Sequence, residues 1–297
     1  MIPTTLKQKL SCPLHRDIPL NLQGEYLLSN CGKQFSTIND IPSILLCDPE
    51  ALDWNPWSLD KVEMSGNTYY QRSIGLLPEK EASKSFAEFM KVNDFFHPND
   101  SILDYGCATG HFYKSFKRIL DNPQYTGFDS HHKFLQYGGE AFGISDQCNF
   151  IRCDAYNIPV LPNSFDISVV NLWHFFPEIY RTIREGLRVT KNYIIWRTPI
   201  SEKQNYTIKL MHNEHTPLHL EEPTEHDIYL ILTKEYIKKV VSALNGKVEM
   251  IVRDTNFEPF DNTLLSDFEN IPATKVVNGM QINGSLILDW HYVVITK

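Results

Sequence analysis

The stretch Ser101-Ile-Leu-Asp-Tyr-Gly-Cys-Ala-Thr-Gly-His-Phe112 decides how the rest of this chain is interpreted. Its first residues are the end of a buried strand, and the turn Gly106-x-Ala108-x-Gly110 follows. These small residues let backbone N–H groups approach a ligand closely and tolerate a positive φ. A helix that begins near His111 points its partial positive end at the same place. The stretch therefore predicts a ligand cradle between a strand and a helix.

The spacing of the small residues favours one class of cofactor over another. A dinucleotide fingerprint, Gly-x-Gly-x-x-Gly, needs its third glycine at position 111, where the sequence has His111. A nucleotide-sugar or NAD-dependent enzyme is therefore disfavoured, although it remains an alternative. The segment instead resembles the Asp-x-Gly-x-Gly/Ala-x-Gly pattern of class I methyltransferases that depend on S-adenosylmethionine (SAM).

Three further segments follow in the order and spacing of that family. Residues 125–129 read as a short strand that ends in a carboxylate, 25 positions after Asp104. Residues 149–155 read as a third strand with Asp154 at its carboxyl end, and residues 165–177 as a fourth, nearly continuous apolar strand. Parallel strands buried on both faces have this apolar character. Ligands of open α/β sheets bind outside the carboxyl ends of the strands, where these carboxylates lie.

The resemblance implies a role for each polar group at those strand ends. Asp104 would order the ammonium group of SAM, Asp129 would accept hydrogen bonds from the ribose hydroxyls, and Asp154 would meet the adenine edge. Asn171 would present its carbonyl oxygen near the ammonium group. The full set of cofactor-binding residues that the resemblance implies is Asp104, Gly106, Ala108, Gly110, Asp129, Asp154, Ala155 and Asn171.

His174, three residues after Asn171, is the candidate catalytic residue. If the acceptor is a hydroxyl, a neutral imidazole can take its proton near pH 7. The alternative is a packed loop histidine in the apolar His-Phe context that is common in the family.

The alternation of strand and helix predicts βαβ units and a parallel sheet. We expect a Rossmann-like α/β fold over residues 80–297, with a seven-stranded class I methyltransferase sheet and helices on both faces. The last two strands would form an antiparallel edge, as the resemblance implies. Helices are predicted at 79–95, 111–120, 131–141, 177–188 and 233–244, and later strands at 192–197, 247–253 and 285–296.

Residues 1–47 predict a small β-rich module ahead of this domain. They resemble the zinc ribbon that precedes some methyltransferases, including a group of ribosomal-RNA guanine methyltransferases. Cys12, His15 and Cys31 match ligand positions, but Leu28 stands where another ligand would be. Structural zinc sites have four ligands, so we expect the fold to be kept and the metal to be lost. Ordinary free cysteines, or a zinc ion completed by another residue, are the alternatives.

Residues 48–79, rich in proline and aromatic residues, predict a linker that forms part of a lid. In the family, the segment ahead of the glycine turn often closes over the cofactor and the acceptor. The candidate contacts to the methionine carboxylate or the acceptor are therefore Tyr69, Tyr70 and Arg72, with simple packing as the alternative.

Residues 198–227 depart from the minimal core and hold four of the 11 histidines. Long loops in compact domains are usually functional or disordered, and we expect this insertion to build the acceptor pocket with His212, His215 and His219. A metal at His212-x-x-His215 is disfavoured, because no carboxylate lies at a supporting helical spacing and Pro217 interrupts the pattern.

Charge and composition favour a small acceptor. The net charge is −8, and the insertion carries two lysines against six carboxylates, whereas nucleic-acid binding depends on many Lys and Arg contacts. We expect methyl transfer to an oxygen or nitrogen of a polar small molecule, such as a sugar or a natural-product intermediate. An RNA base is the first alternative, and a non-catalytic scaffold subunit is the second, although the intact cradle carboxylates argue against it.

The sequence has no run of 18 apolar residues and no signal-peptide core. We therefore expect a cytoplasmic protein with no membrane partner. Its six scattered cysteines are expected to be free thiols.

Overall fold

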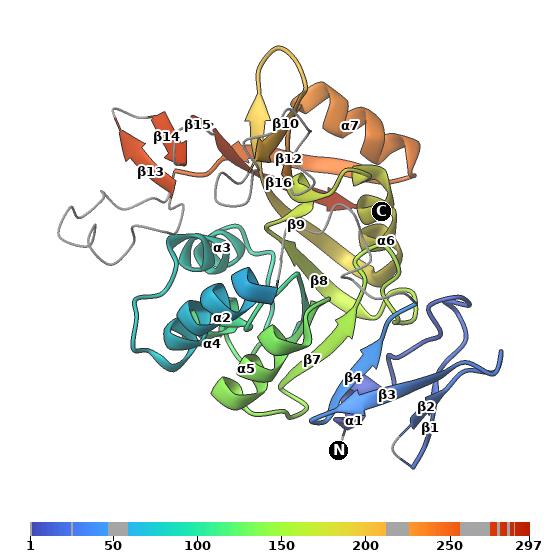
Figure 1. The fold of residues 1–297 in the computed structure, drawn as a ribbon. Coiled ribbons are helices and arrows are strands. Elements are labelled where there is room, and N and C mark those ends of the chain that lie inside the picture. The colour runs from blue at the N-terminus through green and yellow to red at the C-terminus, as the bar shows by residue number, and fades with distance from the viewer. Residues whose placement is uncertain are drawn as a thin grey trace, which may run out of the picture.

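The computed structural model describes residues 2–24, 26–46, 59–211, 226–255, 274–277, 280–283, 286–287 and 289–297. Its centre is a sheet in which five parallel strands are followed by an antiparallel edge (Figure 1). The path runs β7 (Cys148–Cys153), β6 (Gln124–Asp129), β5 (Ser101–Tyr105), β8 (Phe165–Val170), β9 (Thr190–Ser201), β16 (Trp290–Thr296) and β12 (Lys247–Arg253). This arrangement confirms the expected fold class.

Helices cover both faces of this sheet, as Figure 1 shows. Side chains of successive strand residues point to opposite faces, so β5 sends Ile102 into the core cluster under one helical layer and Leu103 into the other. One layer contains α2 (Leu59–Ile74), α3 (Glu81–Val92), α4 (His111–Ile119) and α5 (His132–Phe142), and the other contains α6 (Ile179–Val189) and α7 (Lys234–Ala243).

Helix α2 lies within residues 48–79, for which the sequence predicted a linker and part of a lid but no helix. It has 16 residues and packs against α5 and α4. Gly66, which lies in its first half, hid the helical pattern because glycine is unfavourable by about 1 kcal/mol in a helix interior. An added Cβ at Gly66 would lie 3.1 Å from Cε2 of Tyr137 on α5, so a larger residue there would require the Tyr137 ring to shift.

The N-terminal module extends the central sheet. Its strands form an antiparallel meander, and the last of them pairs in parallel with β7 through Ser43 and Ile44. The sequence did not predict this junction. The module consists of α1 (Thr4–Lys7), β1 (Asn21–Gln23), β2 (Tyr26–Leu28), β3 (Gln34–Ile38) and β4 (Ile41–Ile44).

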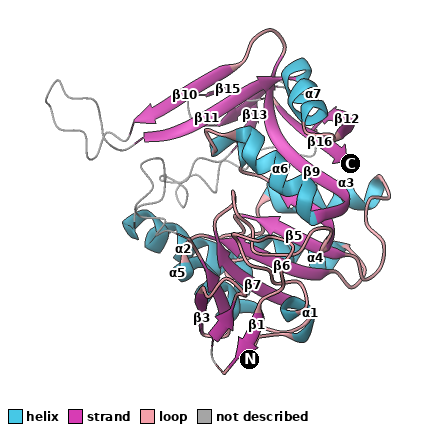
Figure 2. Ribbon diagram, turned by 90° about the vertical axis from the view of Figure 1, so that its right-hand side faces the viewer, coloured by secondary structure: helices cyan, strands magenta, loops and turns pink. Residues whose placement is uncertain are grey.

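The insertion expected at residues 198–227 is not a simple loop, because it contains strands near both of its ends. β10 (Tyr206–Met211) and β11 (His226–Thr233) form an antiparallel arm that projects from the sheet (Figure 2). β11 joins β9 in parallel at Leu232 and Thr233. Residues 212–225, with His212, His215 and His219, lie outside the described residues.

The C-terminal edge is shorter than the predicted strand at 285–296. β16 begins at Trp290, while β13 (Thr274–Val277), β14 (Met280–Asn283) and β15 (Leu286–Ile287) form a separate antiparallel sheet. No helix within the described ranges is both long and apolar enough to cross a lipid bilayer.

Candidate functional site

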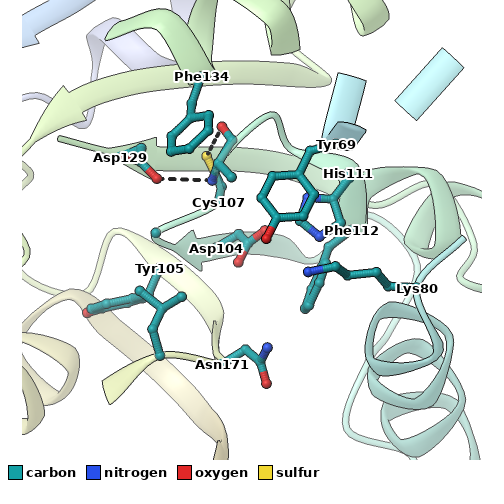
Figure 3. Close-up of a pocket in the computed structure, with 13 residues that line it drawn as sticks. Tyr69, Lys80, Asp104, Tyr105, Cys107, His111, Phe112, Asp129, Phe134 and Asn171 are labelled. Carbon is teal, nitrogen blue, oxygen red and sulfur yellow. Dashed lines mark hydrogen bonds between the residues drawn. The ribbon is translucent and has the colours of Figure 1, made fainter. Parts of the chain in front are cut away.

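A cavity opens at the carboxyl ends of β5, β6 and β8 (Figure 3). It holds about 560 Å³ of empty space, part of which is open to solvent. The sequence-predicted residues that line it are Tyr69, Asp104, Gly106, Ala108, Asp129 and Asn171.

The glycine turn adopts the conformation that its sequence predicts. Gly106 has φ of 60° and Gly110 has φ of 67°, a region that other residues rarely adopt. A Cβ on Gly106 would lie 2.2 Å from Cδ1 of Leu172, and one on Gly110 would lie 2.8 Å from Cε1 of Phe150. Gly106 lines the cavity directly, whereas Gly110 allows the turn to lie close to the Phe150 side chain of β7.

Asp129, the last residue of β6, fixes the middle of this turn. Its Oδ2 accepts a hydrogen bond from the backbone N–H of Ala108 at 3.1 Å, and its Oδ1 accepts one from the backbone N–H of His131 at 3.0 Å. Ala108 is held at φ of 49°, which is unfavourable for a residue with a Cβ. Each carboxylate oxygen can accept a second bond, so Asp129 remains able to bind a diol.

Asp104 is a buried carboxyl group that faces the same space. Its Oδ2 accepts a hydrogen bond from the Tyr125 hydroxyl at 2.7 Å. Burial, helped by the negative charge of Asp129, raises the pKa of Asp104 to about 7 against the opposing effect of the Tyr125 hydrogen bond. A bound cation would favour the ionised form of this carboxyl group.

His111 and Lys80 also line the cavity, and the sequence had not assigned them to the site. His111 is 8% exposed, and within the described part of the chain neither of its ring nitrogens has a hydrogen-bond partner. Burial, helped by the charges of Lys80 and Arg72, lowers its pKa well below the usual value, so the ring is neutral. The sequence singled out His111 only because it stands at the position where a dinucleotide fingerprint has its third glycine.

Tyr69 connects these two side chains. Its ring stacks on His111 with centroids 4.7 Å apart, and Nζ of Lys80 lies 4.2 Å from its centroid. Figure 3 shows the Lys80 ammonium group reaching toward the space beside Asp104. Lys80 is the only lysine or arginine among the described residues that line the cavity.

The neighbouring lid candidates have other contacts. Tyr70 packs against Tyr137 with ring centroids 5.3 Å apart. Arg72 is buried, and its Nη1 donates a hydrogen bond to the carbonyl oxygen of Pro78 at 2.5 Å. Neither Tyr70 nor Arg72 lines the cavity, whereas Tyr69, the third of these candidates, does.

Asp154 and Ala155 lie one strand beyond Asp129, outside the cavity lining. β6 and β7 are in register with Asp129 opposite Arg152, so Asp154 follows at the same edge of the sheet. Its carboxylate accepts bonds from the Tyr156 N–H and from Nδ2 of Asn157, both at 2.9 Å.

The surroundings of His174 do not support its prediction as a general base. Its ring is 1% exposed and packs against Phe175, Tyr229 and Trp290. Burial, with a smaller contribution from the charge of Arg197, lowers the pKa of His174 to about 3. Such an imidazole is a weak base at neutral pH, and it does not line the cavity.

Comparisons with known proteins agree with this geometry. Residues 102–193, which contain the glycine turn, Asp129, Asp154 and Asn171, match the family described as "Methyltransferase domain". The chain carries a class I methyltransferase domain. The family implies SAM as the cofactor.

Two similar proteins extend the comparison. Cycloartenol-C-24-methyltransferase of Arabidopsis thaliana is 27% identical over 116 residues, so the match spans 38% of this chain and only 34% of that methyltransferase. The structure of Burkholderia thailandensis 1,6-didemethyltoxoflavin-N1-methyltransferase, with its namesake ligand and S-adenosylhomocysteine bound, has a TM-score of 0.51 at 9% identity. The match covers 93% of this chain and 97% of that one, and shows a shared fold.

Proposed function

We propose that this chain is a SAM-dependent methyltransferase whose acceptor is a polar small molecule. The observation that carries the proposal is the meeting of the glycine turn, Asp104 and Asp129 in one cavity at the strand ends. SAM presents an ammonium group, a carboxylate, a ribose diol and an adenine ring. Asp104 suits the ammonium group, because a cation compensates the buried carboxylate, and Asp129 suits the diol.

Lys80 and His111 complete the seat for the amino-acid part of SAM. The ammonium and carboxylate groups of an α-amino acid share one carbon, so an ammonium group at Asp104 brings the carboxylate to the adjacent wall. Lys80 supplies a cation there, and the neutral His111 ring supplies an N–H donor that lacks a partner within the described residues. The N-terminus of α4, which starts at His111, also favours an anion.

The remaining cofactor contacts follow the sheet edge. Beyond Asp129, the edge continues to Asp154 and Ala155, which we assign to the adenine. Bound SAM supplies an electrophilic methyl group on a sulfonium ion. The chain's residues align this group with the acceptor and exclude water, which accounts for much of the catalysis available to such a transfer.

Charge supports a small acceptor over RNA. The chain has a net charge of −8, and residues 198–227 have two lysines against six carboxylates. A phosphate backbone needs many cationic contacts. The Burkholderia enzyme that shares the fold has 1,6-didemethyltoxoflavin bound in its structure, which is consistent with this choice.

Calorimetric titration with S-adenosylhomocysteine tests the cofactor assignment, with NAD as the control ligand. We expect saturable binding of S-adenosylhomocysteine and none of NAD; the reverse result would overturn the proposal. Methyl-transfer assays on metabolite extracts and on total RNA, beside gel shifts at low salt, then test the acceptor. Salt-sensitive RNA binding with RNA methylation would contradict the small-molecule assignment, and cofactor binding without any transfer would favour a scaffold role.

A Lys80→Met variant tests whether Lys80 binds the cofactor carboxylate, and the test needs no methyl acceptor. It should weaken S-adenosylhomocysteine binding about 10- to 100-fold, as expected for a lost bond to a charged group. Decarboxylated S-adenosylhomocysteine should bind the variant and the wild type equally. Lys84→Met, one turn along α3, removes a half-buried lysine that pairs with Glu81 and is the matched control. Equal affinity of Lys80→Met and wild type for both ligands would remove Lys80 from the site.

A further inference from the structure

Outside the cofactor cavity, the N-terminal module brings a second group of reactive side chains together. Cys12 and His15 lie in the loop before β1, and Cys31 lies in the turn between β2 and β3. Sγ of Cys12 is 3.8 Å from Sγ of Cys31 and 3.7 Å from Nδ1 of His15. The potential ligand atoms of these three residues all lie within 4.8 Å of one another.

The two separations measured from Sγ of Cys12 match edges of a zinc coordination tetrahedron. Zn–S bonds of about 2.3 Å at the tetrahedral angle place two sulfur atoms about 3.8 Å apart, and a Zn–N bond of about 2.0–2.1 Å places nitrogen about 3.6 Å from sulfur. A disulfide is a poorer description, because its sulfur atoms are only about 2.0 Å apart. The three side chains thus surround a point that an ion could occupy.

Backbone hydrogen bonds hold this arrangement from both sides. The N–H of His15 donates to the carbonyl oxygen of Cys12 at 3.1 Å, which curls the first loop. In the second turn, the N–H of Ser29 donates to Lys33 and the N–H of Gly32 donates to Ser29. Gly32, with φ of 81°, permits this turn. The ligand geometry therefore comes from two hydrogen-bonded turns.

We propose that Cys12, His15 and Cys31 bind one zinc ion through two thiolates and the Nδ1 of the imidazole. Cys12 is buried, whereas His15 and Cys31 are exposed, so the fourth coordination position opens toward solvent and takes a water molecule. The inference goes beyond methyl transfer and reverses the expectation that the metal is lost. Leu28 removes one ligand, but the ligand atoms of the other three residues still lie within 4.8 Å of one another.

Ser29 supports the site from outside the coordination sphere. Its hydroxyl oxygen lies 3.2 Å from Sγ of Cys31, and Ser29 is 7% exposed. A hydroxyl that donates to a zinc-bound thiolate holds its orientation. Serine is outside the usual Cys, His and carboxylate ligands of zinc, so we assign the fourth position to water.

Elemental analysis of the full chain tests the proposal. The wild type would be incubated with zinc sulfate, desalted and measured by inductively coupled plasma mass spectrometry. We expect one zinc ion per chain in the wild type and loss of zinc in Cys31→Ser and His15→Ala, whose side chains are exposed and whose folding is checked by circular dichroism. His97→Ala removes another exposed histidine, paired with Asp100, and should keep its zinc.

Two further measurements sharpen the ligand assignment. Cobalt(II) in place of zinc should give thiolate-to-metal charge-transfer absorption in the wild type, and this absorption should be absent in Cys31→Ser. Ser29→Ala should keep the stoichiometry and lower the zinc affinity about 10- to 100-fold, the usual effect of losing an outer-shell partner. Trace zinc only in the folded wild type, equal zinc in all variants, or a Cys12–Cys31 disulfide in zinc-treated protein would each overturn the proposal.

Discussion

Two buried carboxyl groups near the carboxyl ends of the strands have opposite surroundings. Asp254 accepts a hydrogen bond from Nε of Arg197 at 2.7 Å and another from the Ser85 hydroxyl at 2.8 Å. Asp104 accepts one from Tyr125, faces the cavity, and has a pKa raised to about 7 by burial. The protein compensates the charge of Asp254 with its own cation. At Asp104 we infer that the ligand supplies the cation.

The largest expected effect comes from breaking the Asp254 pair. Arg197→Met should lower the free energy of unfolding by about 3–5 kcal/mol, because it leaves a buried charge without its partner. Denaturant titration measures the change. Arg253→Met, which removes a more exposed arginine paired with Asp289, should cost less than about 1 kcal/mol. A similar small loss for both variants would show that Asp254 and Asp104 do not differ as we describe.

We expect His174, like Asp254, to contribute to stability and not to ligand binding. His174→Ala should cost about 2–4 kcal/mol of stability, in the range for emptying a packed core position, while the affinity for S-adenosylhomocysteine stays near the wild-type value. Thermal unfolding and calorimetry check the two parts. A stable, folded variant whose turnover falls about 10²- to 10⁴-fold would restore the general-base role.

We expect Asp129, which lines the cavity beside Asp104, to contribute to ligand binding. Asp129→Ala should weaken S-adenosylhomocysteine binding by about 1.5–3 kcal/mol, the range for hydrogen bonds to a charged group. The Asp129 bond to Ala108 is also lost, so Asp129→Asn, which keeps an acceptor oxygen, should bind better than the alanine variant. Unchanged calorimetric affinity in folded Asp129→Ala would remove the ribose assignment.

The difference between the two carboxyl groups also explains what the sequence could predict. Asp104 is the second-last residue of β5 and Asp129 is the last residue of β6, so their place at the sheet edge follows from the local sequence pattern. The glycine turn forms the cradle beside them. Lys80 and His111 meet only because α2 places Tyr69 between them, and Gly66 concealed that helix.

Contacts between segments that are far apart in the chain could not be predicted from the sequence either. β4 joins β7 across more than a hundred positions, and Asp254 meets Arg197 and Ser85 from three separate elements. No local period encodes such contacts. His174 illustrates the same limit, because its neighbours Tyr229 and Trp290 arrive from β11 and β16.

The pH dependence of S-adenosylhomocysteine binding tests the central claim most directly. With a pKa of about 7 in the free protein, Asp104 is mostly protonated at pH 6 and mostly ionised at pH 8. An ammonium group favours the ionised form, so binding at pH 6 should release about one proton, and affinity should fall by up to about tenfold per pH unit below 7. Calorimetry in two buffers of different ionisation enthalpy measures the released proton, and Asp104→Asn should abolish it. Equal affinity at pH 6 and pH 8 without proton release would contradict the account.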